Sequence, residues 1–142
     1  MIGKTYDQIS VGDISEFSKT FSETDIYLYA GISGDFNPAH INETFASKTY
    51  FKTRIAHGML SAGLISAVIG TQLPGPGSIY MQQTLTFLAP VHIGDTVTAR
   101  VEVVEKIDKK KVRMQTTCTN QDAVVVLEGE AMVSPPRSLS QE

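Results

Sequence analysis

The sequence is poor in cysteine, tryptophan and charge, and these shortages exclude several classes of protein. Cys118 is the only cysteine among 142 residues, which excludes an internal disulfide framework and a cysteine-rich zinc site. The formal net charge is −3, so the chain offers no basic surface for nucleic acid. A membrane-spanning helix needs about 18 consecutive apolar residues, and no such run is present. Residues 1–10 also lack the apolar core of a secretory signal, so we expect a cytoplasmic protein that does not bind membranes.

Apolar residues make up 42% of the chain, a composition that favours a folded protein over intrinsic disorder. The length is typical of one domain, and no repeat or low-complexity linker divides the sequence. We therefore expect a single domain over residues 1–142. A flexible tail is expected from about residue 134, because Pro135 and Pro136 cannot continue a sheet ladder.

The first half of the sequence carries helix-start signals. Ser22 followed by Asp25 is typical of a capped helix start, and apolar residues at 3–4 spacing extend this helix to about Gly34. Asn42 can cap a second, shorter helix that runs through Ala46.

A third helical segment, residues 58–71, is apolar almost all round and carries no charge. Such a helix is expected to be buried on most sides. Gly58 and Gly63 lower its helix propensity, which predicts the close approach of another backbone.

From residue 79 onward apolar and polar residues alternate, the pattern of half-buried strands. The alternation predicts strands over residues 79–88, 97–103, 112–119 and 124–133, with residues 14–21 a further candidate. The fold class expected is α+β, with an antiparallel meander packed against the helix of residues 58–71.

The segment of residues 78–84 is a candidate edge strand without charge or proline. Monomeric proteins usually protect a sheet edge with such residues. We therefore expect this strand to pair with its copy in a homodimer of about 31 kDa.

Asp35 and His40 lie on either side of Pro38. Pro38 prevents a regular helix and favours an extended Asn37, so the carboxylate and the imidazole can point to one spot. There they could hold a water and move its proton near neutral pH. The alternative is an Asx turn in which Asp35 only caps the backbone and His40 is packed or solvated. Together with His57 the two residues lack the spacing typical of metal ligands, so we expect no metal site.

His57 and Gly58 begin the apolar helix. The free N–H groups and the dipole at a helix start suit an oxyanion, such as a thioester carbonyl gaining enolate character. An ordinary glycine at a helix start is the alternative. Ser66 shares a broad face with Gly58 and could contact a ligand or bond back to its own helix.

Five segments carry a resemblance to a known family: DFNPAH at residues 35–40, AHGML at 56–60, LPGPGSIY at 73–80, FLAPV at 87–91 and GDTV at 94–97. The first matches the D-x-N-P-x-H motif of the MaoC-like (R)-specific enoyl-CoA hydratases. The similarity covers about residues 5–133 and departs from the family pattern at none of these motif positions.

The resemblance implies a hot-dog fold, in which an antiparallel sheet wraps a long central helix, and a dimer whose acyl tunnel lies near the subunit interface. It implies a lyase that reversibly hydrates trans-2-enoyl-CoA to (R)-3-hydroxyacyl-CoA. Neither a metal nor a redox cofactor is implied, because coenzyme A is part of the substrate.

The resemblance also implies a role for seven residues. Asp35 and His40 would be the catalytic pair, and Gly58 would offer its backbone N–H to the thioester carbonyl. The remaining four would bind the substrate or support the motif loop: Asn37 would brace that loop, and Ser66, Ile69 and Val133 would line the acyl end of the tunnel.

Three other functions stay open at this point. A (3R)-hydroxyacyl dehydratase would run the same chemistry backwards on an acyl-carrier-protein substrate. A hot-dog thioesterase would drive water at the carbonyl carbon and would not require the Asp35–His40 pair. A non-enzymatic acyl-CoA-binding module would be expected only if the catalytic positions were altered.

Overall fold

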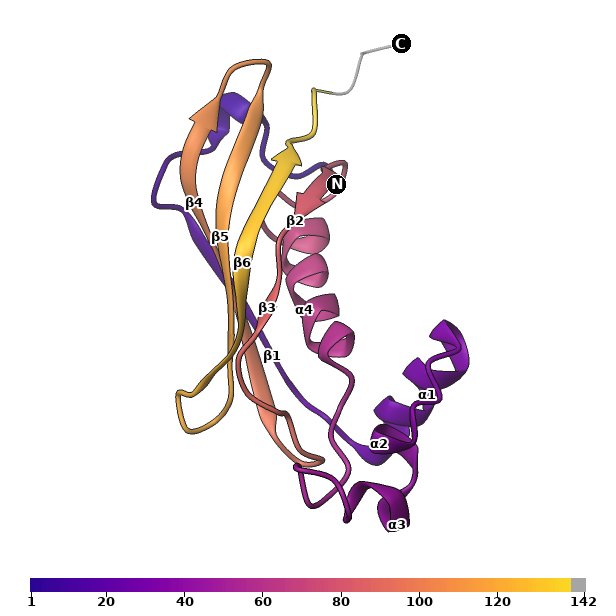
Figure 1. Ribbon diagram of the computed structural model, residues 1–142. Coiled ribbons are helices and arrows are strands. Elements are labelled where there is room, and N and C mark those ends of the chain that lie inside the picture. Colours follow the sequence, from indigo (N-terminus) through magenta and orange to yellow (C-terminus); the bar gives the residue numbers. More distant parts are fainter. Residues whose placement is uncertain (139–142) are drawn as a thin grey trace.

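The computed structural model describes residues 1–138 as one antiparallel sheet with a long helix on one face and a helical segment beyond one end (Figure 1). In chain order the elements are the 3-10 turn η1 (Tyr6–Gln8), β1 (Ile14–Thr20), α1 (Glu23–Ser33), α2 (Pro38–Ile41), α3 (Glu43–Ala46), α4 (Gly58–Thr71), β2 (Ile79–Gln83), β3 (Thr86–Phe87), β4 (Thr96–Ile107), β5 (Lys111–Thr119) and β6 (Val125–Ser134). The predicted α+β class and the predicted helix over residues 58–71 are both confirmed.

The sheet has the strand order β1-β4-β5-β6-β2, and the short β3 also pairs with β6. Buried and partly exposed residues alternate along β5 and the first half of β4, so one face of the sheet is covered. Lys109 and Lys110 adopt left-handed backbone angles in the turn between β4 and β5. The predicted edge position of residues 78–84 is confirmed, because β2 pairs with β6 alone.

The single strand expected over residues 79–88 is wrong, since β2 and β3 are separate strands. Thr84 between them hydrogen-bonds to Glu130 through both its backbone N–H and its hydroxyl. A Cβ at Gly129 would lie 1.8 Å from the Thr84 carbonyl oxygen. The backbones therefore approach there as only glycine permits, and the regular ladder is interrupted.

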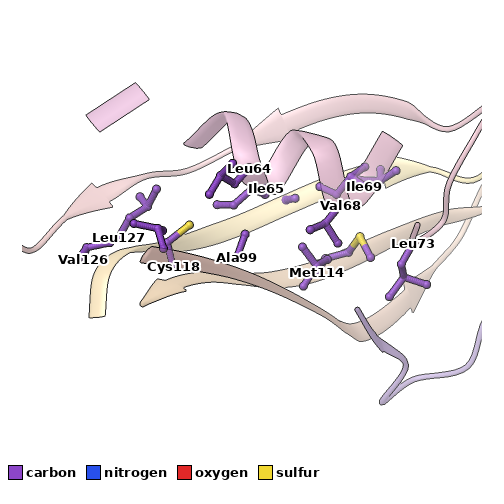
Figure 2. Close-up of a cluster of buried hydrophobic side chains, with 14 of the residues drawn as sticks. Leu64, Ile65, Val68, Ile69, Leu73, Ala99, Met114, Cys118, Val126 and Leu127 are labelled. Atoms are coloured by element: carbon purple, nitrogen blue, oxygen red, sulfur yellow. The ribbon is translucent and has the colours of Figure 1, made fainter. Parts of the chain in front are cut away.

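The hydrophobic core lies between α4 and the sheet (Figure 2). Ile65, Val68 and Ile69 point from the helix toward Met114 and Cys118 on β5, and all five are at most 1% exposed. Burial raises the pKa of the Cys118 thiol to about 12, so this lone cysteine stays protonated and unreactive.

Only one side of α4 is buried, and the expectation of burial on most sides is wrong. Met59 is 52% exposed, and Gly63, Ser66 and Gly70 are also exposed. The reason is that the sheet of one chain covers a single face of the helix. A Cβ at Gly63 would meet nothing within 4 Å, so the expected close backbone approach does not occur there.

The helical segment α1–α3 begins as predicted. The Ser22 hydroxyl accepts a hydrogen bond from the Asp25 backbone N–H (3.1 Å), while the Asp25 carboxylate accepts from the Ser22 N–H (2.9 Å). The Asn42 side chain likewise caps α3 by accepting from the Phe45 N–H. Arg54 holds the segment together, because its guanidinium bonds Glu23 on α1 and approaches Glu43 on α3 at 3.4 Å.

The expected tail does not begin at residue 134. Ser134 is the last residue of β6, and Pro135 and Pro136 are buried. Pro136 packs closely on Gly77: a Cβ added to Gly77 would lie 2.9 Å from the Cβ of Pro136. Residues 139–142 of the expected tail lie outside the described residues. Within residues 1–138, no helix combines the length and apolarity needed to cross a membrane.

Candidate active site

The loop between α1 and α2 is built by local hydrogen bonds. Gly34 ends α1 in the left-handed conformation with φ 80°, and Pro38 occupies the first turn of α2. The Asp35 carboxylate accepts from the Asn37 N–H at 3.2 Å, and the Asn37 side chain accepts from the Ala39 N–H at 3.1 Å. The loop thus contains the Asx turn that was the alternative interpretation of Asp35. That turn also fixes the direction in which the carboxylate points.

His40 lies on α2, is 8% exposed, and places its Nδ1 2.7 Å from the Ile55 carbonyl oxygen. A carbonyl can only accept, so Nδ1 carries the proton and donates it. In the neutral ring the lone pair is therefore on Nε2, and this nitrogen is the one available as a base.

His57 is the N-cap residue of α4 and packs against His40, with ring centroids 3.9 Å apart. Its Nε2 lies 2.9 Å from the Asp35 backbone carbonyl oxygen and donates to it, for the same reason. Its Nδ1 is buried without a hydrogen-bond partner among the described residues. Burial lowers the pKa of His57 and proximity to His40 lowers it further, while the hydrogen bond to Asp35 opposes both. His57 is therefore neutral at neutral pH.

Asp35, His40 and His57 place side-chain oxygen and nitrogen atoms within 4.8 Å of one another. The structure thus brings together the three residues whose sequence spacing does not suggest a metal site. The two imidazole planes are stacked and tilted by only 33°. The nitrogen lone pair of an imidazole lies in the plane of its ring. The lone pairs of two stacked rings therefore do not point to one ion at the nitrogen–zinc distance of roughly 2.0–2.1 Å. The geometry suits proton transfer better than metal binding.

A cavity of about 490 Å³ opens beside this cluster. The polar residues that line it include Asp35, His40, His57 and Ser61, and the N-terminus of α4 lies beside them. Its apolar walls come from loop 50–56, from residues 87–91 and from β6, and include Phe51, Ile55, Phe87, Leu88, Val91 and Leu127. A polar end with dry walls is typical of a site for a largely apolar ligand.

Gly58 lies at the boundary between the polar cluster and the apolar wall. It is the first residue of α4, and the first N–H groups of a helix have no partner inside the helix. A Cβ on Gly58 would lie 2.5 Å from the Phe87 ring, so a side chain here would compete with the cavity wall. The predicted close approach at Gly58 therefore exists, but the neighbour is a side chain.

The structure does not bring all the predicted site residues to this cavity. Asn37 supports the loop but is not part of the cavity wall. Ser66 is exposed on the uncovered side of α4. Ile69 and Val133 are 1% and 0% exposed in the core between α4 and the sheet, away from the cavity lining.

Sequence reasoning assigned no role to His57 beyond a rejected metal site, and it did not single out Phe87 as a wall. His57 directly precedes a helix that begins with glycine, which was a usable signal for a side chain held at the helix start. No sequence signal indicated its contact with Asp35, because that hydrogen bond joins residues 22 positions apart.

The chain is similar to known proteins over most of its length. The profile of the family described as MaoC like domain matches residues 8–124. The chain is 59% identical to the (R)-specific enoyl-CoA hydratase of Rhodospirillum rubrum over 92% of this chain and 91% of that protein. It is 50% identical to the 3-hydroxybutyryl-CoA dehydratase of Methylorubrum extorquens, over 93% and 84%.

Among solved structures, the unliganded R-hydratase of Pseudomonas aeruginosa superposes with a TM-score of 0.90 at 44% identity. The match covers 99% of this chain and 94% of that one. The (R)-hydratase of Aeromonas caviae, described as involved in PHA biosynthesis, superposes with a TM-score of 0.87 at 42% identity, over 90% and 98%. The fold is therefore that of the R-hydratases, and this chain belongs to the family of proteins with a MaoC-like domain.

Proposed function

We propose that this protein catalyses the reversible, (R)-specific hydration of trans-2-enoyl-CoA to (R)-3-hydroxyacyl-CoA. The observation that carries the proposal is the meeting of Asp35, His40 and the α4 N-terminus at one end of a mostly apolar cavity. Two similar curated relatives are named (R)-specific enoyl-CoA hydratase and 3-hydroxybutyryl-CoA dehydratase, and these names describe the two directions of this reaction.

The thioester carbonyl binds at the Gly58 N–H in this proposal. The C2–C3 double bond is conjugated to that carbonyl, so attack at C3 moves the π electrons toward the carbonyl oxygen. A backbone N–H aimed at the developing oxyanion, at the positive end of the α4 dipole, lowers the energy of the enolate. The family resemblance assigns the same role to Gly58.

The Asp35–His40 pair handles the water. As the water oxygen bonds to C3, its proton moves to the pair, and the Nε2 lone pair of neutral His40 can accept it. The enolate then collapses while the pair returns one proton to C2 on the same face. No metal or redox step is needed, since the reaction transfers only the elements of water.

The homodimer remains part of the proposal. The open edge of β2 includes Ile79, Tyr80 and Met81, which are 63%, 37% and 44% exposed. Strand β2 lies next to α4 (Figure 1). In this proposal a second copy covers the exposed Ser66 and places it near a tunnel at the interface. Ile69 and Val133 remain proposed tunnel residues, although both are buried in the core of the single chain.

A crotonyl-CoA assay tests the proposed function. Loss of enoyl absorbance without release of free thiol, with (R)-3-hydroxybutyryl-CoA as the product, is expected. Release of thiol at the same rate would instead identify a thioesterase. The same assay with crotonyl-acyl-carrier protein compares the two carriers, and a higher kcat/KM on the carrier protein would contradict the CoA assignment. The cytoplasmic location remains a prediction from the sequence.

A further inference from the structure

His57 is the one polar side chain of the cluster to which neither the family resemblance nor the proposed reaction gives a role. It is 2% exposed, and its ring lies between His40 (centroids 3.9 Å apart) and Tyr29 (4.7 Å). Its Nε2 donates to the Asp35 carbonyl oxygen, whereas its Nδ1 has no partner among the described residues. Leaving a buried nitrogen unpaired costs about 1–3 kcal/mol, so packing alone does not explain a histidine here.

We infer that His57 is a positioning residue that fixes the Asp35 carboxylate through the Nε2–H hydrogen bond to the Asp35 backbone carbonyl. The inference rests on the proposed catalytic role of Asp35 and His40. Asp35 is exposed and sits in a loop whose other hydrogen bonds are local, to Ser33 and Asn37. The hydrogen bond from His57 connects Asp35 to the start of α4, where the proposed thioester site lies.

The neutral state of His57 supports this role. A protonated His57 would place a second positive charge against His40, the group proposed to accept a proton during each turnover. Because burial and His40 both lower its pKa, His57 keeps its uncharged ring and a fixed donor while His40 changes charge. An imidazole therefore supplies the hydrogen bond without competing for the proton.

Two substitutions separate the hydrogen bond from the packing. His57→Gln keeps an N–H donor and loses the ring, whereas His57→Phe keeps a ring against His40 and loses the donor. A 1 Å displacement of a reacting group can cost about 10²-fold in rate, so we expect kcat to fall about 100-fold in His57→Phe. In His57→Gln we expect a fall of only about 10-fold, with KM for crotonyl-CoA within about threefold of wild type in both variants.

A role limited to packing predicts the opposite order, because Phe preserves the shape of the ring better than Gln. A kcat higher in His57→Phe than in His57→Gln, or unchanged in both, would overturn the inference. Val68→Ala is the matched control, since Val68 is 0% exposed on the same helix and does not line the cavity. Its kcat per folded molecule should equal that of wild type, and a fall as large as that of His57→Phe would also contradict the inference.

Imidazole ¹⁵N spectra of the wild-type protein test the same hydrogen bond without a variant. They should show a neutral His57 with its proton on Nε2 and a bare Nδ1 at neutral pH. A proton on Nδ1, or on both nitrogens, would overturn the inference even if the variants fail to fold. Wild-type protein that lacks activity on crotonyl-CoA would instead contradict the proposed function, and the spectra separate the two failures.

Discussion

Gly58→Ala should separate catalysis from stability at the start of α4. An ideal Cβ on Gly58 lies 2.5 Å and 2.6 Å from two carbons of the Phe87 ring, whereas ordinary contact begins near 3.4 Å. The ring must therefore move by about 1 Å, a displacement large enough to cost about 10²-fold when it affects reacting groups.

The stability of this variant should change little. Phe87 is 52% exposed on the short strand β3, so its ring can move toward solvent without opening a core cavity. Replacing glycine by alanine in a helix gains roughly 0.5–1 kcal/mol, which opposes the cost of moving the ring. We expect the free energy of unfolding to stay within about 1 kcal/mol of wild type, while kcat/KM for crotonyl-CoA falls about 10–100-fold.

Urea unfolding and the enoyl-absorbance assay measure the two effects on the same protein. Gly31→Ala is the matched control, because Gly31 lies exposed within α1 and a Cβ there would meet nothing within 4 Å. It should gain about 0.5–1 kcal/mol of stability and keep wild-type kinetics. If Gly58→Ala retained kcat/KM within about twofold of wild type, the close approach of the Phe87 ring to Gly58 would not matter for the reaction.

Four further predictions follow from the site, the core and the sheet edge. Asp35→Asn and His40→Gln should each lower kcat by about 10²–10⁴-fold while circular dichroism shows a folded chain; near wild-type turnover in either would remove that residue from the catalytic pair. Ile69→Ala should lower the free energy of unfolding by about 2–5 kcal/mol, because the side chain is buried in the core. If the acyl tunnel reaches Ile69, the variant should also favour longer enoyl chains, and an unchanged chain-length profile in folded protein counts against Ile69 as a tunnel residue. Met81 lies at the irregularity of β2 between the paired residues Tyr80 and Gln82. Met81→Pro removes its backbone N–H and should weaken dimer and activity together, whereas light scattering that shows an active monomer would reject the dimer. Arg54→Leu should lower the melting temperature and reduce its acid dependence in part. The pKa of Glu23 is lowered by the Tyr27 hydroxyl and then by the Arg54 side chain, and the pKa of Glu43 is lowered first by the Arg54 backbone N–H, which leucine keeps. The contribution of the guanidinium is therefore present above pH 4.5 and lost as pH falls below it, and an unchanged acid slope would contradict the role of the Arg54 side chain.

Tertiary packing corrected several expectations drawn from the sequence. The strand expected over residues 79–88 divides into β2 and β3, because Gly129 on the neighbouring strand lets Thr84 approach as only a glycine permits. Alternation along one strand contains no information about which residue faces it across the sheet. Burial of residues 58–71 was overestimated for a related reason, since periodicity shows that a surface is apolar but not how much of it the rest of the chain can cover.

The sequence by itself determined the local structure of the site. Gly34 ends α1, Pro38 prevents a continuous helix, and the side chains of Asp35 and Asn37 bond backbone N–H groups two residues ahead. These interactions join neighbouring residues, so residue type and spacing suffice to predict them. The same is true of α4, whose bounds follow from an uninterrupted apolar segment between His57 and the Leu73–Pro74 stop.

Only the tertiary structure decided what these local pieces do together. The proton on His40 Nδ1 is assigned by the Ile55 carbonyl, 15 residues away, and His57 acquires its partner because α4 starts beside the motif loop. Ser66 and Ile69 lie three residues apart on α4. Ser66 is exposed, whereas Ile69 is 1% exposed because the sheet covers its side of the helix. Contacts of this kind depend on the distance between atoms in the folded chain, which sequence separation does not encode.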